Sequence, residues 1–170
     1  LTHSRDEGAA KEKLSAYGLD VPCHAMATGV DAAAEAAMSL LPVALKARGV
    51  AHKTDIGGVA LGLTTKTAVL EAATQMGCDD FFIEEMIADP IAELLVAILA
   101  DPAHGYVLTL GAGGVMTELW QDTTHVLVPA TDQDIRSALE RLRIAPLLRG
   151  YRGKPAANIE AVVAAVMALQ

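Results

Sequence analysis

The chain has 170 residues, of which 52% are hydrophobic and only 4% aromatic, enough for one domain or two closely packed lobes with an aliphatic core. Its net charge of −8 argues against nucleic acid as a partner, because phosphate backbones select basic surfaces. No apolar run reaches the ~18 residues that a membrane-spanning helix needs, and no signal peptide opens the chain, so we expect a soluble protein without membrane association.

The first half of the chain predicts a small lobe in which helices alternate with strands. Ser4 to Glu7 have the form of a capping box, and Gly18 and Gly77 are in the positions of helix-ending glycines. We expect helices at about 4–17, 28–41 and 65–76, and strands at about 43–47, 59–63 and 81–86. This order is typical of an α+β lobe that contains a hairpin.

The second half predicts an antiparallel sheet followed by helices. We expect strands at 93–99, 106–110, 115–119 and 126–128, because turn residues separate these short apolar runs. Thr131, with Asp134 three residues later, predicts the start of a helix. A terminal helix is predicted to begin at Asn158, with Met167 among its inward residues.

One apolar run carries a single lysine. Lys46 lies in the segment Pro42-Val-Ala-Leu-Lys-Ala47, which reads as a buried strand. A lysine is costly to bury unless an anion binds it, and Gly57-Gly58 shortly afterwards lets backbone N–H groups approach phosphate oxygens. The pattern therefore predicts a polyphosphate site.

The distribution of charge assigns the cations of such a site to the first third of the chain. Between Lys66 and Arg136 the sequence has twelve acidic residues and no lysine or arginine. A nucleotide would therefore meet its positive charge chiefly at Lys46 and Lys53. The two cysteines, Cys23 and Cys78, match no metal spacing and no secreted disulfide framework, which favours a cytoplasmic location.

Six motifs in order extend over nearly the whole chain. They are Val-Ala-Leu-Lys, His-Lys-Thr-Asp-x-Gly-Gly-Val, Ile-Glu-Glu-Met, Glu-Leu-x-Val-x-Ile-x-x-Asp-Pro, Gly-x-Gly-Gly-Val-x-x-Glu-Leu and Pro-Leu-Leu-Arg-Gly-Tyr-Arg-Gly. In this combination the chain resembles the ATP-grasp module of ADP-forming (NDP-forming) acyl-CoA synthetases. The resemblance implies an α+β ATP-grasp fold with nucleotide between two lobes, a smaller one at 23–89 and a larger one made of 1–22 and 90–170.

The resemblance also implies roles for individual residues. Lys46, Lys53, Gly57 and Gly58 match the segments that contact the nucleotide phosphates, and His52 matches the histidine of a phosphohistidine relay. Neutral imidazole suits that role because it is nucleophilic near its ordinary pKa of about 6.5. The alternatives are a lysine that only extends its ammonium to solvent and a histidine that only bonds within its loop.

Carboxylates complete the implied site. Glu84, Glu85 and Met86 match the hinge that holds adenosine, and only one of two adjacent glutamates can face the nucleotide, for which we favour Glu84. Glu93 matches a glutamate near the ribose and phosphates, and the alternative is an outward residue on a half-exposed strand. Glu118 is the implied ligand of the Mg²⁺ that accompanies ATP.

The resemblance implies an acid–CoA ligase that converts acid, ATP and CoA into acyl-CoA, ADP and phosphate. It also implies a partner Rossmann-like CoA-binding domain or subunit, partner domains that supply the carboxylic acid and CoA, and an oligomeric assembly. Because the sequence begins at Leu1 and ends within an amphipathic pattern, we expect a piece of a longer protein. The alternative function is a nucleotide-sensing, degenerate region of a protein acetyltransferase.

Two further features of the second half carry predictions of their own. The basic segment 149–153 is predicted either to clamp an anion such as phosphate or CoA, or to pack on the acidic sheet or on a neighbouring domain. Trp120, the single tryptophan, is predicted to anchor the core.

Overall fold

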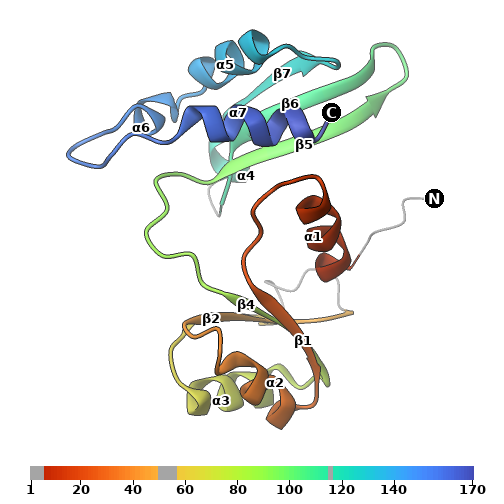
Figure 1. The fold of residues 1–170 in the computed structure, drawn as a ribbon, viewed down its shortest axis with the longest axis vertical. Coiled ribbons are helices and arrows are strands. Elements are labelled where there is room, and N and C mark those ends of the chain that lie inside the picture. The colour runs from red at the N-terminus through yellow and green to blue at the C-terminus, as the bar shows by residue number, and fades with distance from the viewer. Residues whose placement is uncertain (1–5, 50–56, 115–116) are drawn as a thin grey trace. The chain divides into compact units, whose positions relative to one another are not determined.

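A computed structural model describes residues 6–49, 57–114 and 117–170, with the side chain of Glu118 outside the description. The chain divides into two compact units, residues 1–88 and residues 89–170. Both combine helices with an antiparallel sheet (Figure 1). The α+β class is therefore confirmed.

The first unit is a four-stranded antiparallel sheet with helices. Its elements are α1 (Glu7–Ala16), β1 (His24–Thr28), α2 (Val30–Ala37), β2 (Val43–Ala47), β3 (Val59–Leu63), α3 (Lys66–Met76) and β4 (Asp80–Glu85), and the strand order is β1-β4-β2-β3. Thr65 caps α3 with its side chain, and Gly77 ends this helix in the left-handed region with φ 62°, as the sequence predicts. Strand β1 was not predicted, and the helix expected from residue 28 begins at Val30.

The two faces of this sheet are chemically different. One face packs against α2 and α3 through small and branched side chains, including Ala33, Val69 and Leu45. The opposite face carries Phe82, and α1 lies on that side of the sheet (Figure 1). The approach is close, because a Cβ added to Gly8 of α1 would lie 3.1 Å from the Met26 sulfur. The family resemblance groups residues 1–22 with 90–170, whereas α1 packs on the sheet of the first unit.

The second unit is a three-stranded antiparallel sheet with helices packed on one face. Its elements are β5 (Leu94–Asp101), β6 (Gly105–Ala112), α4 (Thr117–Trp120), β7 (Thr123–Leu127), α5 (Asp132–Arg141), α6 (Ala145–Leu148) and α7 (Ile159–Ala168), in strand order β5-β6-β7. Buried residues of β6, α5 and α7 form one core, among them Leu108, Ile135 and Val166.

Local signals set the helix starts in this unit, and two sequence predictions fail. Thr131 and Asp134 form the predicted capping box of α5, and Asn158 caps α7. The predicted strand at 115–119 is wrong, because residues 117–120 form the short helix α4. Met167 is predicted to point inward but is 43% exposed, and the buried residues of α7 are Val163 and Val166.

Candidate functional site

Strand alternation places Lys46 on the α1 side of the first sheet. Its neighbours in β2, Leu45 and Ala47, are buried, and Leu45 belongs to the core against α2 and α3. The Lys46 ammonium therefore emerges on the opposite face, with its side chain about one-fifth exposed. Its Nζ lies 2.5 Å from Oε1 of Glu7 and 2.9 Å from Oε2 of Glu84, so Lys46 donates to two carboxylates.

Glu84 is the buried acid of the same face. It lies on β4 opposite Ala44 of β2, and only 7% of the residue is exposed. Its two carboxylate oxygens are divided between two lysines, because Oε1 accepts from Lys11 of α1 and Oε2 accepts from Lys46. Glu85 is the next residue of the strand and is only partly buried.

An aromatic ring lies beneath both ammonium groups. The Nζ atoms of Lys11 and Lys46 lie 5.9 Å and 5.7 Å from the centroid of the Phe82 ring. His24 of β1 stacks on the same ring, with 5.2 Å between centroids. The negative face of an aromatic ring attracts cations, so Phe82 interacts favourably with both ammonium groups.

The ion pairs decide the protonation of the cluster. Burial alone lowers the pKa of Lys46, but the hydrogen bonds to Glu7 and Glu84 outweigh it, and the pKa is raised. Burial alone raises the pKa of Glu84, but the hydrogen bonds from Lys11 and Lys46 outweigh it, and the pKa is lowered. At neutral pH Lys46 and Glu84 are therefore both charged.

The segment of the predicted glycine hairpin is only partly described, whereas residues 84–86 of the predicted hinge are all described. His52 and Lys53 lie outside the described residues. Gly57 has φ 72°, a conformation that favours glycine, and the carbonyl of Gly58 accepts the N–H of Ala47 at 2.8 Å. At the hinge, the N–H of Met86 donates to the carbonyl of Pro42 at 2.8 Å.

The glycine motif of the second unit brings backbone segments close together. A Cβ added to Gly111 would lie 2.8 Å from the carbonyl oxygen of Asp122, and the N–H of Gly113 donates to the carbonyl of Glu93 at 2.8 Å. Glu93 is exposed and stands next to Gly114, where an added Cβ would meet its carboxylate. The motif thus packs the start of β5 against the loop that follows β6.

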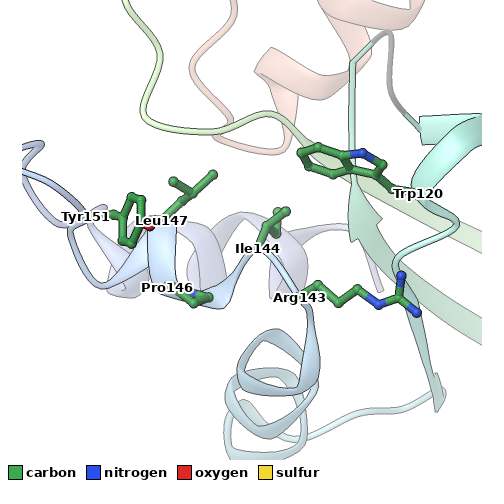
Figure 2. A pocket seen from close by; sticks show the side chains of 6 residues that line it. All are labelled: Trp120, Arg143, Ile144, Pro146, Leu147 and Tyr151. Atoms are coloured by element: carbon green, nitrogen blue, oxygen red, sulfur yellow. The ribbon is translucent and has the colours of Figure 1, made fainter.

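A hollow of about 400 Å³ lies on the surface of the second unit (Figure 2). Its lining is mainly apolar and comes from α4 and from the segment around α6: Trp120, Arg143, Ile144, Pro146, Leu147 and Tyr151. Trp120 is 45% exposed, so its assignment to the core was wrong; it ends the short helix α4 and forms part of this hollow. Tyr151 is also exposed, and the Arg152 guanidinium lies 5.2 Å from its ring.

Sequence reasoning missed three residues that the structure singles out. Glu7 and Lys11 of α1 join the Lys46–Glu84 cluster, and their four-residue spacing, which puts two side chains on one helix face, was the available signal. The third is Asp122, which lies between the predicted strands at 115–119 and 126–128. It is buried and accepts the backbone N–H groups of Arg143 and Ile144 at 2.8 and 3.1 Å.

The described residues also limit other kinds of site. Within ranges 6–49, 57–114 and 117–170, no three His, Cys, Asp or Glu side chains lie close enough together to hold a metal ion. The side chain of Glu118, the predicted magnesium ligand, is not among those described. No helix in the same part of the chain is long and apolar enough to cross a membrane.

Comparison with known proteins supports the ATP-grasp assignment over the full length. The family model of the ATP-grasp domain matches residues 2–170. The chain is 31% identical to the beta subunit of an ADP-forming acetate–CoA ligase from Pyrococcus furiosus, with 92% of this chain and 72% of that subunit covered. It is 34% identical to a trans-feruloyl-CoA synthase from an unknown prokaryotic organism, of which it spans only 24%.

Solved structures agree with the sequence relatives. An acetyl-coenzyme A synthetase from Ca. Korarchaeum cryptofilum, in complex with coenzyme A and Ca-AMPCP, superposes with a TM-score of 0.87 at 29% identity over 96% of this chain and 77% of that chain. Another structure of that protein holds coenzyme A and Mg-AMPPCP, with a phosphohistidine segment pointing towards the nucleotide binding site. Its TM-score is 0.80 at 31% identity, over 95% of this chain and 75% of that one. The chain therefore belongs to the ATP-grasp family and is a module homologous to those of the ADP-forming acyl-CoA synthetases.

Proposed function

We propose that this chain is the ATP-binding domain of an enzyme that forms acyl-CoA, ADP and phosphate from a carboxylic acid, CoA and ATP. The observation that carries the proposal is the position of Lys46. Lys46 lies on a core strand, and its ammonium is on the α1 side of the sheet, where it is charged and lies over the Phe82 ring. A phosphate oxygen can accept from such a donor in a low-dielectric setting, which strengthens the contact.

The remaining residues of the proposed nucleotide site follow the family motif. Lys53, Gly57 and Gly58 are proposed to contact phosphates, while Glu84, Glu85, Met86 and Glu93 are proposed to lie near adenosine. In the structure, both oxygens of Glu84 already bind lysines. Its contribution to nucleotide binding is therefore to hold Lys46 in place.

His52 is proposed to receive the γ-phosphate. Attack by a carboxylic acid on ATP would require one site to hold both reactants, whereas a histidine divides the transfer into two steps. A neutral imidazole nitrogen attacks the γ-phosphorus, the bond from phosphorus to the β,γ-bridging oxygen breaks, and ADP leaves with that electron pair. The phosphoryl group then passes to the carboxylate substrate, and the thiol of CoA displaces phosphate from the acyl phosphate.

Magnesium is proposed to accompany the nucleotide. When bound, Mg²⁺ neutralises charge on the phosphate oxygens. Mg²⁺ in nucleotide sites is usually held by one or two carboxylates and the substrate phosphates. Glu118 is proposed as one such carboxylate.

The substrate acid and CoA are proposed to be bound by partner domains or subunits, including a Rossmann-like CoA-binding domain, in an oligomeric assembly. This proposal is supported by the lengths of the relatives: one is a beta subunit, of which this chain covers 72%, and another is a longer chain, of which it covers 24%. Both cysteines are free thiols, which supports a cytoplasmic location for the assembly.

The test uses the full-length protein with magnesium and ATP labelled on the γ-phosphate. We expect acid-labile, base-stable label on the protein, as a phosphohistidine gives. The variant His52→Ala should lose both the label and acyl-CoA formation while it still binds AMPPCP. His104→Ala is the matched control, because His104 is exposed and bonds locally to Asp101. Normal turnover by His52→Ala would overturn the relay.

A further inference from the structure

Helix α1 adds two charged residues to the Lys46 cluster. Glu7 and Lys11 are one helical turn apart and face the sheet together, so four alternating charges lie in a row: Glu7, Lys46, Glu84 and Lys11. The two inner members of the row, Lys46 and Glu84, are mostly buried, with 21% and 9% of their side chains exposed. Charges in such surroundings are only weakly screened by solvent.

Lys11 acts on Lys46 through Glu84. If Lys46 were the single partner of Glu84, the carboxylate would offset the positive charge of Lys46 and repel an approaching phosphate. In the structure Lys11 takes one of the two carboxylate oxygens and shares the negative charge. It also fixes the rotation of the carboxylate, because each oxygen has its own lysine.

We propose that Lys11 is a positioning residue for nucleotide binding: it holds and neutralises Glu84 so that the ammonium of Lys46 remains available to a phosphate group. This inference rests on the proposed function, since it concerns the same nucleotide site. Glu7 has the opposite effect, because its carboxylate occupies Lys46 directly and competes with phosphate for the same donor.

Loss of the Lys11 charge should leave α1 in place. The helix is also tethered by an ion pair between Asp6 and Arg48 and by the close approach of Gly8 to Met26. Methionine retains most of the length and apolar character of the lysine stem, so Lys11→Met keeps the packing over Phe82. The variant therefore tests charge rather than shape.

The experiment measures AMPPCP affinity, with magnesium, by calorimetric titration of the full-length protein. We expect Lys11→Met to weaken binding by about tenfold, the scale of one charge-assisted contact. Lys11→Arg should bind like the wild type. Glu84→Gln combined with Lys11→Met should recover most of the loss, because the charge that Lys11 neutralises is then absent.

Glu7→Gln is the matched control on the same helix face. A purely structural role of α1 predicts that Glu7→Gln and Lys11→Met both weaken binding, whereas the electrostatic role predicts that Glu7→Gln strengthens it. Unchanged affinity of Lys11→Met, or loss in both variants without recovery by Glu84→Gln, would overturn the inference and leave the proposed function standing. A wild-type protein that fails to bind AMPPCP would overturn the proposed function and this inference together.

Discussion

Replacing Lys46 with methionine tests the nucleotide site most directly. The change removes the ammonium that donates to Glu7 and Glu84 but keeps an unbranched apolar stem over Phe82. A hydrogen bond to a charged partner contributes ~1.5–3 kcal/mol, so we expect ATP affinity to fall roughly ten- to a hundredfold. Calorimetric titration with AMPPCP measures the change.

The same substitution has a predictable effect on stability. Removing one member of a fully buried pair costs about 3–5 kcal/mol. Here Glu84 keeps its bond from Lys11 and the Lys46 side chain is 21% exposed, so we expect a loss of only about 1–2 kcal/mol in the free energy of unfolding. Urea denaturation monitored by circular dichroism gives this value.

The pH dependence follows from the lowered pKa of Glu84. A carboxyl whose pKa is lower in the folded state stabilises the fold above its unfolded pKa, and this contribution is lost as pH falls through the folded pKa. Without Lys46, one of the two hydrogen bonds that lower the pKa of Glu84 is gone. In Lys46→Met the folded-state pKa of Glu84 is therefore lowered less, so the stability that Glu84 contributes should be smaller and should be lost completely at a higher pH than in the wild type.

The control is Lys66→Met, which removes an exposed lysine paired with Glu35 at the start of α3. Surface pairs of this kind contribute about 0–1 kcal/mol, so both stability and AMPPCP affinity should stay near the wild-type values. Equal affinity of Lys46→Met and the wild type would exclude Lys46 from the nucleotide site. Equal weakening by Lys66→Met would show that nonspecific charge, rather than position, governs binding.

Two further substitutions test the packing of the second unit. Gly111→Ala should lower the free energy of unfolding by about 1–3 kcal/mol in urea denaturation, because the new Cβ would lie 2.8 Å from a backbone carbonyl oxygen. The control is Gly105→Ala, whose Cβ meets no atom within 4 Å and which should show only the strain of its positive φ, about 1–2 kcal/mol. A larger loss at Gly105 than at Gly111 would contradict this ranking. Asp122→Ala leaves two N–H groups at the α5–α6 junction without their acceptor and should cost about 1–3 kcal/mol, whereas unchanged stability would mean that water replaces the carboxylate.

The elements that sequence reasoning found carry their signals locally. Helix α3 has its cap at Thr65 and its end at Gly77 within the sequence itself, and α5 has a complete capping box. Strand β1 has no such signal. Its residues His-Ala-Met-Ala-Thr are short and partly polar, and they become a strand because they pair with β4 over five positions.

The failed strand prediction has a local cause as well. The apolar residues after Gly114 suggested a strand, but Gly114 has φ 77°, and the hydroxyl of Thr117 donates to the Gly114 carbonyl at 2.6 Å. This reversal starts the helix α4. A sequence pattern of apolar residues does not reveal that the preceding glycine turns the chain.

The parts of the candidate site that depend on a single strand could be predicted from the sequence. The alternation of side chains along β2 gave the orientation of Lys46, and the alternation along β4 separated Glu84 from Glu85. The contribution of α1 depends on how a helix more than thirty residues earlier in the sequence packs on the sheet. The sequence signal for this long-range packing is weak, because it consists of the four-residue spacing of Glu7 and Lys11.

The accessibility of the two carboxylates at Lys46 indicates which contact a phosphate would replace. Glu84 is held from both sides and its side chain is 9% exposed, whereas the side chain of Glu7 is 30% exposed. Phosphate would therefore take the place of Glu7. Because binding equilibria at a shared donor are reciprocal, nucleotide at Lys46 must weaken the hold of Glu7 by the same factor by which Glu7 weakens nucleotide binding. The bond between Lys11 and Glu84 does not involve Glu7, so we expect α1 to remain on the sheet while Lys46 changes its partner.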